Sequence, residues 1–189
     1  LDLILSRRFH PWEGGEGAVL RQFTNAHLLL GQAALEAGNA DTAHHHFTSA
    51  MDTPESLGEA YHPLQAKADV NYWIARSLAA QENTAEAEKH YQASANEAGD
   101  FSSMAVIEHS PLSYYRGLSL IELGKKEEAN KLFASLKTFG ENQLKIKATI
   151  DYFATSLPNI LVFDEDLQTR HNQEAKNLIN LAEKGLTLS

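Results

Sequence analysis

The sequence predicts an all-α fold, an α-α superhelix in which about four helical hairpins stack into a right-handed solenoid. Two observations predict this fold. Three segments of the chain share one spacing of small and aromatic residues, which indicates an internal repeat. The C-terminal segment has apolar residues at helical intervals, for example at Leu144, Ile150 and Phe153.

The repeated spacing joins a small residue, an alanine and an aromatic residue. In each segment the small residue lies 12 positions before the alanine, and the aromatic follows the alanine by four. The three sets are Gly31, Ala43 and Phe47; Ala75, Ala87 and Tyr91; and Gly117, Ala129 and Phe133. This spacing predicts two helices in close contact, with the small residue on one helix and the alanine and aromatic on one face of the other.

Glycines mark the turns of two of these hairpins. Gly38 and Gly124 fall where the first helix must end, and a left-handed conformation costs little at glycine. The middle segment has no glycine there, and we expect Asn83 to take that role. Together the three hairpins predict a repeat domain over residues 24–137, preceded by an N-terminal segment over 1–23 with a glycine-rich turn.

A fourth hairpin is predicted over residues 138–189, where it caps the solenoid. Its first helix runs from Asn142 to Ser156 and ends before Pro158, because the residue before a proline disfavours helix. Its second helix runs from Leu167 to Leu186, with Asp164 or Asp166 as the N-cap and Gly185 as the C-terminal stop.

The repeated spacing resembles that of the tetratricopeptide repeat, whose two helices carry a small residue, an alanine and an aromatic at these positions. The resemblance covers roughly residues 24–137. The sequence departs from the family in two ways. The repeats recur after 44 and 42 residues instead of about 34. His27, Asn71 and Ser113 stand where the family has a bulky aromatic.

This resemblance implies a concave groove lined by the first helix of each hairpin. The positions three and two before the small residue, and one after it, would face the groove, and leucines occupy three of them. The binding candidates at the other six are Gln32, Tyr72, Trp73, Arg76, Tyr114 and Tyr115. Aromatic side chains and arginine are typical of binding surfaces. The alternative is that one aromatic of each adjacent pair packs between hairpins.

Composition excludes several partners. The net charge of −9 and the pI of 5.4 argue against nucleic acid, because binding phosphates needs clustered Lys and Arg. The chain has no cysteine, hence no disulfide or thiolate metal site. Since the sequence has no apolar run of about 20 residues, we expect no membrane partner. A cytoplasmic location is the default expectation, and the missing initiator Met suggests a fragment of a longer chain.

The stretch RFHPWEGGEG, residues 8–17, allows two interpretations. His10, Trp12, Glu13 and Glu16 could form a ligand loop, with a base, an aromatic platform and two acids. Alternatively, the proline and glycines form a tight turn before the first helix, with the Trp buried and Glu16 near the helix N-terminus. The stretch lacks the glycine spacing of phosphate-binding motifs, so no cofactor is predicted.

Three consecutive histidines, His44, His45 and His46, resemble a metal site at first sight. Consecutive helical residues point about 100° apart, so these three cannot converge on one ion. We therefore predict no metal site, and expect solvated or half-buried histidines on the second helix of the first hairpin.

A wider resemblance covers nearly the whole chain. The phrases FHPWEGGEG, ESLGEAYHPLQAKAD and DYFATSLPNILVFDEDLQ are similar to the C-terminal helical part of large bacterial proteins in which a mutarotase-like β-domain precedes tetratricopeptide repeats. This resemblance implies a link to carbohydrate metabolism. It supplies no catalytic residue.

Two functions follow as hypotheses. The first is a non-catalytic scaffold that binds a protein, a peptide, an adjacent domain of the same chain, or another copy of itself. The second is the helical accessory part of a carbohydrate-active enzyme, in which the 8–17 loop completes a sugar site. Glycoside cleavage needs two placed carboxylates, which Glu13 and Glu16 would have to provide.

Overall fold

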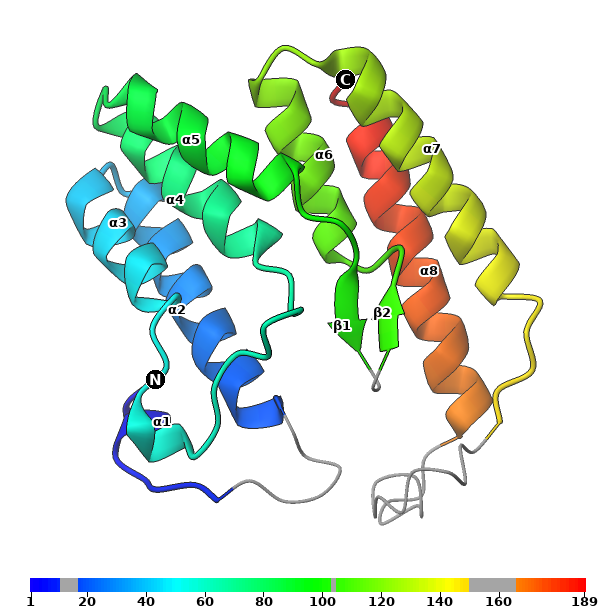
Figure 1. Ribbon diagram of the computed structural model, residues 1–189, viewed down its shortest axis with the longest axis horizontal. Coiled ribbons are helices and arrows are strands. Elements are labelled where there is room, and N and C mark those ends of the chain that lie inside the picture. The colour runs from blue at the N-terminus through cyan, green and yellow to red at the C-terminus, as the bar shows by residue number, and fades with distance from the viewer. Residues whose placement is uncertain (11–16, 103–104, 150–165) are drawn as a thin grey trace.

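The computed structural model describes residues 1–10, 17–102, 105–149 and 166–189 (Figure 1). Nearly all of its regular structure is helical, and the fold is all-α. The helices are α1 (Asp2–Leu5), α2 (Ala18–Glu36), α3 (Ala40–Ser49), α4 (Ala68–Ala80), α5 (Thr84–Ala95), α6 (Leu112–Glu122), α7 (Lys126–Gln143) and α8 (Leu167–Leu186), with a 3-10 turn η1 (Glu55–Leu57) and two strands, β1 (Asp100–Ser102) and β2 (Ala105–Ile107).

Three hairpins stack into the predicted superhelix. The helix pairs α2 and α3, α4 and α5, and α6 and α7 each form one hairpin. The second helix of each hairpin packs against the next first helix, so α3 contacts α4, α5 contacts α6, and α7 contacts α8. The first helices also follow one another directly, from α2 through α4 and α6 to α8 (Figure 1). Helix α8 therefore occupies the place of a fourth first helix.

The seam of each hairpin is built as the spacing predicts. Gly31, Ala75 and Gly117 are all buried, as are the alanines and aromatics opposite them. A Cβ atom added to Gly31 would lie 2.3 Å from Cε1 of Phe47, and one added to Gly117 would lie 2.3 Å from Cε1 of Phe133. The aromatic ring itself therefore occupies the space that the missing side chain leaves.

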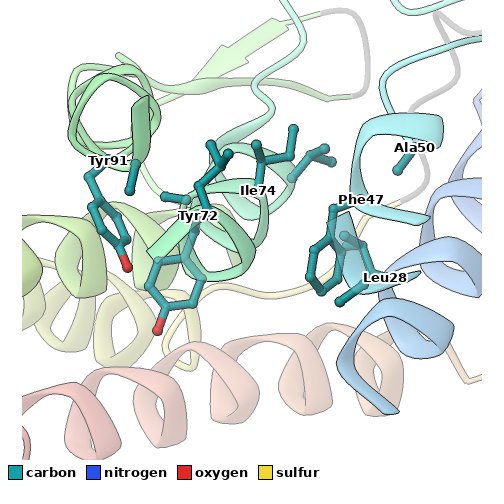
Figure 2. Close-up of a cluster of buried hydrophobic side chains, with 11 residues drawn as sticks. Leu28, Phe47, Ala50, Tyr72, Ile74 and Tyr91 are labelled. Atoms are coloured by element: carbon teal, nitrogen blue, oxygen red, sulfur yellow. The ribbon is translucent and has the colours of Figure 1, made fainter. Parts of the chain in front are cut away.

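The largest apolar cluster spans the first two hairpins. Figure 2 shows Phe47 beside Leu28 at one end, and Tyr72 beside Tyr91 at the other. Trp73 joins the two hairpins, because its ring stacks on Phe47 with the centroids 5.6 Å apart. The core is thus continuous from one repeat to the next, as a solenoid requires.

The turns between paired helices use the predicted backbone conformation, with one correction. Gly38 and Gly124 have φ of 79° and 75°, in the left-handed region. In the middle hairpin the left-handed residue is Glu82, with φ of 62°, and not Asn83. Asn83 instead has φ of −86° and is the N-cap residue of α5. The left-handed position lies directly before the N-cap in all three hairpins, and the prediction misplaced it by one residue in the middle one.

The predicted fourth hairpin is wrong in its first helix. Helix α7 continues to Gln143, and residues 144–149 form turns and coil where a new helix was expected. The rest of that predicted helix, residues 150–156, lies outside the described residues. Helix α8 begins as predicted, and its N-cap Asp166 accepts a hydrogen bond from the backbone N of Gln168 at 2.9 Å.

Gly185 is not the C-terminal stop of α8. It lies inside the helix, and a Cβ atom there would meet Phe133 at 2.4 Å. Phe133 therefore lies between two glycines, Gly117 on α6 and Gly185 on α8. The same small-residue device that joins the helices of a hairpin also attaches α8 to the end of the solenoid.

One connector between hairpins contains two paired strands that the sequence analysis did not predict. Strands β1 and β2 pair antiparallel, with Phe101 opposite Val106. The ring of Phe101 stacks on His62 of the preceding connector, with centroids 3.9 Å apart. The preceding connector also caps α2, because the Glu59 carboxylate accepts hydrogen bonds from the backbone N atoms of Gly17 and Leu20 at 2.6 and 2.8 Å.

Candidate functional site

A groove of about 1090 Å³ lies between α2 and α8 on the inner side of the solenoid. Helices α4 and α6 contribute Asp69, Leu112 and Tyr115 to its floor, and strands β1 and β2 contribute Asp100 and Ile107. Because α2 and α8 are the first and last helices of the stack, the groove exists only once all the hairpins are assembled.

One face of α2 forms the first wall. Arg21, Asn25, Leu28 and Gln32 line the groove at intervals of four, three and four residues, which is the spacing of one helical face. Leu29 also lines it and is 66% exposed, the second most exposed large apolar side chain of the described residues. This wall therefore presents an apolar side chain to the solvent between two amides and a guanidinium.

The floor carries two buried carboxylates. Asp69 is 5% exposed and Asp100 is 8% exposed. Oδ1 of Asp69 accepts a hydrogen bond from the backbone N of Val70 at 2.9 Å, and its Oδ2 lies 3.6 Å from Nη1 of Arg21. Burial raises the pKa of Asp69, while the Arg21 guanidinium lowers it and the Asp100 carboxylate raises it further. An ionised carboxylate at this floor is therefore costly in desolvation.

The opposite wall comes from α7 and α8. Ala175 and Leu178 of α8 line the groove with their buried faces, beside the more polar His171 and Glu174. Nε2 of His171 lies 2.8 Å from the backbone O of Gln143, which fixes the end of α7 to α8. Phe139 of α7 completes this wall.

His109 lies between the floor and this wall and is buried. Its Nε2 is 2.9 Å from Oγ of Ser135, and its ring meets Phe139 edge-on. Among the described residues its Nδ1 has no hydrogen-bond partner. Burial lowers the pKa of His109. A buried imidazole, with one ring nitrogen unpartnered among the described residues, therefore lines the groove.

Of the six predicted groove residues, Gln32 and Tyr115 line this groove. The expectation that Tyr72 and Tyr114 face it is corrected, because both are buried in the core. Tyr72 packs against Tyr91, and Tyr114 packs against Phe133, each on the second helix of its own hairpin. Their ring neighbours Trp73 and Tyr115 are only partly buried.

Trp73 and Arg76 lie outside the described lining of the groove. Trp73 packs on Phe47, as described above. Arg76 is half-exposed, donates a hydrogen bond from Nη1 to Oη of Tyr72 at 2.9 Å, and lies 3.9 Å from Oε1 of Glu122 on α6. It follows Asp69 by seven residues, so it continues the groove face of α4 beyond the cavity.

The structure describes residues 8–10 and 17 of the 8–17 loop. His10 is exposed. Trp12, Glu13 and Glu16 lie outside the described residues, and both interpretations of this loop remain predictions.

The three consecutive histidines diverge, as the helical geometry predicts. Nδ1 of His44 lies 3.0 Å from Oγ of Ser77, Nδ1 of His46 lies 3.3 Å from Nδ1 of His27, and His45 is exposed. Within the part of the chain that the structure describes, no three His, Asp or Glu side chains form a group that could hold a metal ion.

His27 and Asn71 also explain the departure from the family's aromatic position. His27 pairs with His46 across the first hairpin, and the amide oxygen of Asn71 lies 3.0 Å from Nδ1 of His90 across the second. The two pairs hold equivalent places, because both members of each recur after 44 residues. In the first two hairpins, a pair of polar side chains that joins the two helices therefore replaces the packed aromatic of the family.

Sequence reasoning missed Asp69, Asp100 and His109. Asp69 could have been found, because it lies seven residues before the candidate Arg76 and hence on the same helical face. Asp100 and His109 lie in the connector that contains the β-hairpin, where no helical spacing applies.

Comparison with known proteins agrees with the repeat geometry. Residues 112–138, which cover α6 and most of α7, match the family model of the tetratricopeptide repeat. No solved structure matches the chain. None of the helices among the described residues is both long and apolar enough to cross a bilayer. The chain is thus tetratricopeptide-like, and such repeats generally serve protein–protein interaction.

Proposed function

We propose that this protein is a non-catalytic interaction scaffold and that its groove holds an extended segment of a partner protein. The observation that carries the proposal is the groove between α2 and α8, which is lined along its length by the first helices of the stack. The family match over residues 112–138 supports the same function, because tetratricopeptide repeats generally bind other proteins.

The groove is at the upper end of the size range of small-molecule pockets and is large enough for a peptide segment. Small-molecule pockets enclose about 300–1,000 Å³ and bury most of the ligand. This groove has about 1090 Å³ and is bounded by separate helices, so it can take several consecutive side chains. Its lining combines apolar residues such as Leu29 with amides and charged groups, which can contact both the apolar and the polar atoms of a peptide.

The test is to select binders from a displayed library of random peptides and then to locate their site. Leu29→Ala should weaken the selected peptides about tenfold, or about 1.4 kcal/mol, because it removes an apolar contact from the groove wall. Fluorescence anisotropy with labelled peptide gives the affinity.

Leu64→Ala is the matched control. Leu64 is 59% exposed, similar to the 66% of Leu29, but does not belong to the described groove lining. Equal losses in the two variants, or binders unaffected by Leu29→Ala, would place the peptide elsewhere and count against the proposal.

A further inference from the structure

The floor of the groove contains more negative charge than its own contacts balance. Asp100 lies near enough to raise the pKa of the buried Asp69, and the cation that faces Asp69 is Arg21. The Arg21 to Asp69 distance of 3.6 Å exceeds that of a charge-assisted hydrogen bond, which is about 2.7–2.9 Å. The Arg21 side chain is also 36% exposed, so part of its charge is screened by water.

Each carboxylate also has few other partners among the described residues. Oδ1 of Asp100 accepts a hydrogen bond from the backbone N of Ala66 at 3.3 Å, and Asp69 accepts from the backbone N of Val70. An ionised carboxylate can accept about four hydrogen bonds. Buried carboxylates with unused acceptor capacity are costly to keep charged, and such residues in a groove are candidates for binding sites.

The residues around these acids suit a long, positively charged side chain. Leu112 and Tyr115 of the floor and Leu28 of the α2 wall line the groove and offer apolar surface for methylene groups. Lysine and arginine side chains commonly lie along apolar surface and place only the charged end at a polar partner. His109, whose Nδ1 has no partner among the described residues, lines the same cavity and can complete the polar contacts.

The charge of the whole lining points the same way. The groove is lined by three carboxylates, from Asp69, Asp100 and Glu174, and by two guanidiniums, from Arg21 and Arg170. The two buried groups among them are both acids. An acidic occupant would therefore meet like charge at the floor, whereas a basic one supplies the missing counter-charge.

We infer that the groove floor is a subsite for a lysine or arginine side chain of the bound segment, with Asp69 and Asp100 as the receiving carboxylates. This inference rests on the proposed peptide-binding function and specifies the chemistry of its partner. In the free protein the two acids are retained at a cost in stability, and the partner's cation offsets that cost on binding.

The experiment selects 12-residue peptides from a random displayed library on the wild-type protein and, in parallel, on Asp69→Asn. We expect wild-type binders to be enriched in Lys and Arg and this enrichment to be lost on the variant. A selected peptide should lose at least tenfold in affinity when its basic residue is replaced by glutamine, and about tenfold when Asp69→Asn is used instead. Asp100→Asn should give a loss in the same direction and serves as the second variant.

Thermal unfolding without peptide separates binding from a structural role. Asp69→Asn should raise the melting temperature, because the amide is cheaper to bury than the carboxylate, while Asp52→Asn, at an exposed site, should change neither stability nor affinity. A lower melting temperature with unchanged affinity would show that Asp69 only tethers α2 to α4, and overturn the inference.

The outcomes also distinguish the inference from the function on which it rests. Peptides that depend on Leu29 but carry no basic residue, or that bind Asp69→Asn and Asp100→Asn as well as the wild type, overturn the basic-side-chain subsite and leave the scaffold function standing. A library that yields no binder sensitive to Leu29→Ala removes the scaffold function itself.

Discussion

The seams between helices and the floor of the groove are both buried, but they are built in opposite ways. At the seams, a glycine or alanine faces an aromatic ring, and Phe47 and Phe133 have no exposed surface. At the floor, Asp69 is nearly as buried but holds a carboxylate whose nearest cation is 3.6 Å away. Burial at the seam removes apolar surface from water, whereas burial at the floor removes a charge from it.

This difference teaches where stability and binding are located. Apolar seams hold the solenoid together, and the same seam is repeated along the chain. The polar floor contributes little to that stability. Burying its carboxylates lowers the free energy of unfolding, and such a loss of stability is typical of binding sites. Substitutions at the seams should therefore lower the stability of the protein, whereas replacing a carboxylate of the floor by an amide should raise it.

Truncating a seam aromatic should have the largest effect. Phe133→Ala removes the ring that lies between Gly117 and Gly185, and should destabilise the protein by about 3–5 kcal/mol in urea unfolding. Phe101→Ala is the control, because Phe101 is only partly buried and belongs to the β-hairpin. A loss at Phe133 no larger than that at Phe101 would mean that the last seam does not hold α8.

Adding a methyl group to a seam should have the next largest effect. Gly31→Ala places a Cβ atom 2.3 Å from the ring of Phe47, so helices α2 and α3 must move apart, at a cost of about 1–3 kcal/mol. In an ordinary helix the same change would be stabilising. Gln22→Ala, at an exposed position of α2, should stay within about 0.5 kcal/mol of the wild type. A stabilised Gly31→Ala protein would contradict the packing of this seam.

Acid should weaken the hairpins. Burial lowers the pKa of His27, His46 and His90, so below pH 6.5 the unfolded chain binds more protons than the folded one. Stability is therefore complete above that pH and is lost as the pH falls through 6.5 toward the folded-state values. The urea midpoint should be lower at pH 5.5 than at pH 7.5, and the fall should shrink when His27→Gln and His46→Gln are combined.

The groove floor should respond to acid with the opposite sign. The raised pKa of Asp69 means that the folded state takes up its proton first, so this carboxylate adds stability as the pH falls toward that pKa. Asp69→Asn should therefore make the acid-induced loss steeper than in the wild type. A shallower loss in Asp69→Asn would contradict the raised pKa.

The seams could be predicted from sequence and the groove floor could not, for a physical reason. A seam is set by residues on two helices joined by a short turn, so its spacing recurs along the chain, as with Gly31 and Phe47 or Gly117 and Phe133. The floor combines Asp69 of α4 with Asp100 of a connector, and the distance between them depends on how that connector folds. No repeated spacing of residues in the sequence predicts that distance.

The errors in the prediction have similar local causes. Gly185 was interpreted as a helix stop because glycine commonly ends helices, but here the packing of Phe133 requires a small residue within the helix. Tyr72 and Tyr114 were expected in the groove because the family pattern places their positions there. They are buried because their rings pack against the second helix of their own hairpins, Tyr72 against Tyr91 and Tyr114 against Phe133.

The smallest predicted effect concerns the turn of the middle hairpin, where the repeat lacks its glycine. Glu82 holds φ of 62°, at the position that Gly38 and Gly124 occupy in the other hairpins. A side chain in the left-handed region costs about 1–2 kcal/mol, and glycine's greater freedom in the unfolded chain offsets part of that. Glu82→Gly should therefore stabilise the protein by about 0.5–1 kcal/mol in urea unfolding. Glu88→Gly, at an exposed position inside α5, should cost about 1 kcal/mol instead. If both glycines destabilised the protein alike, Glu82 would not hold the left-handed turn, and the three hairpins would not share one geometry.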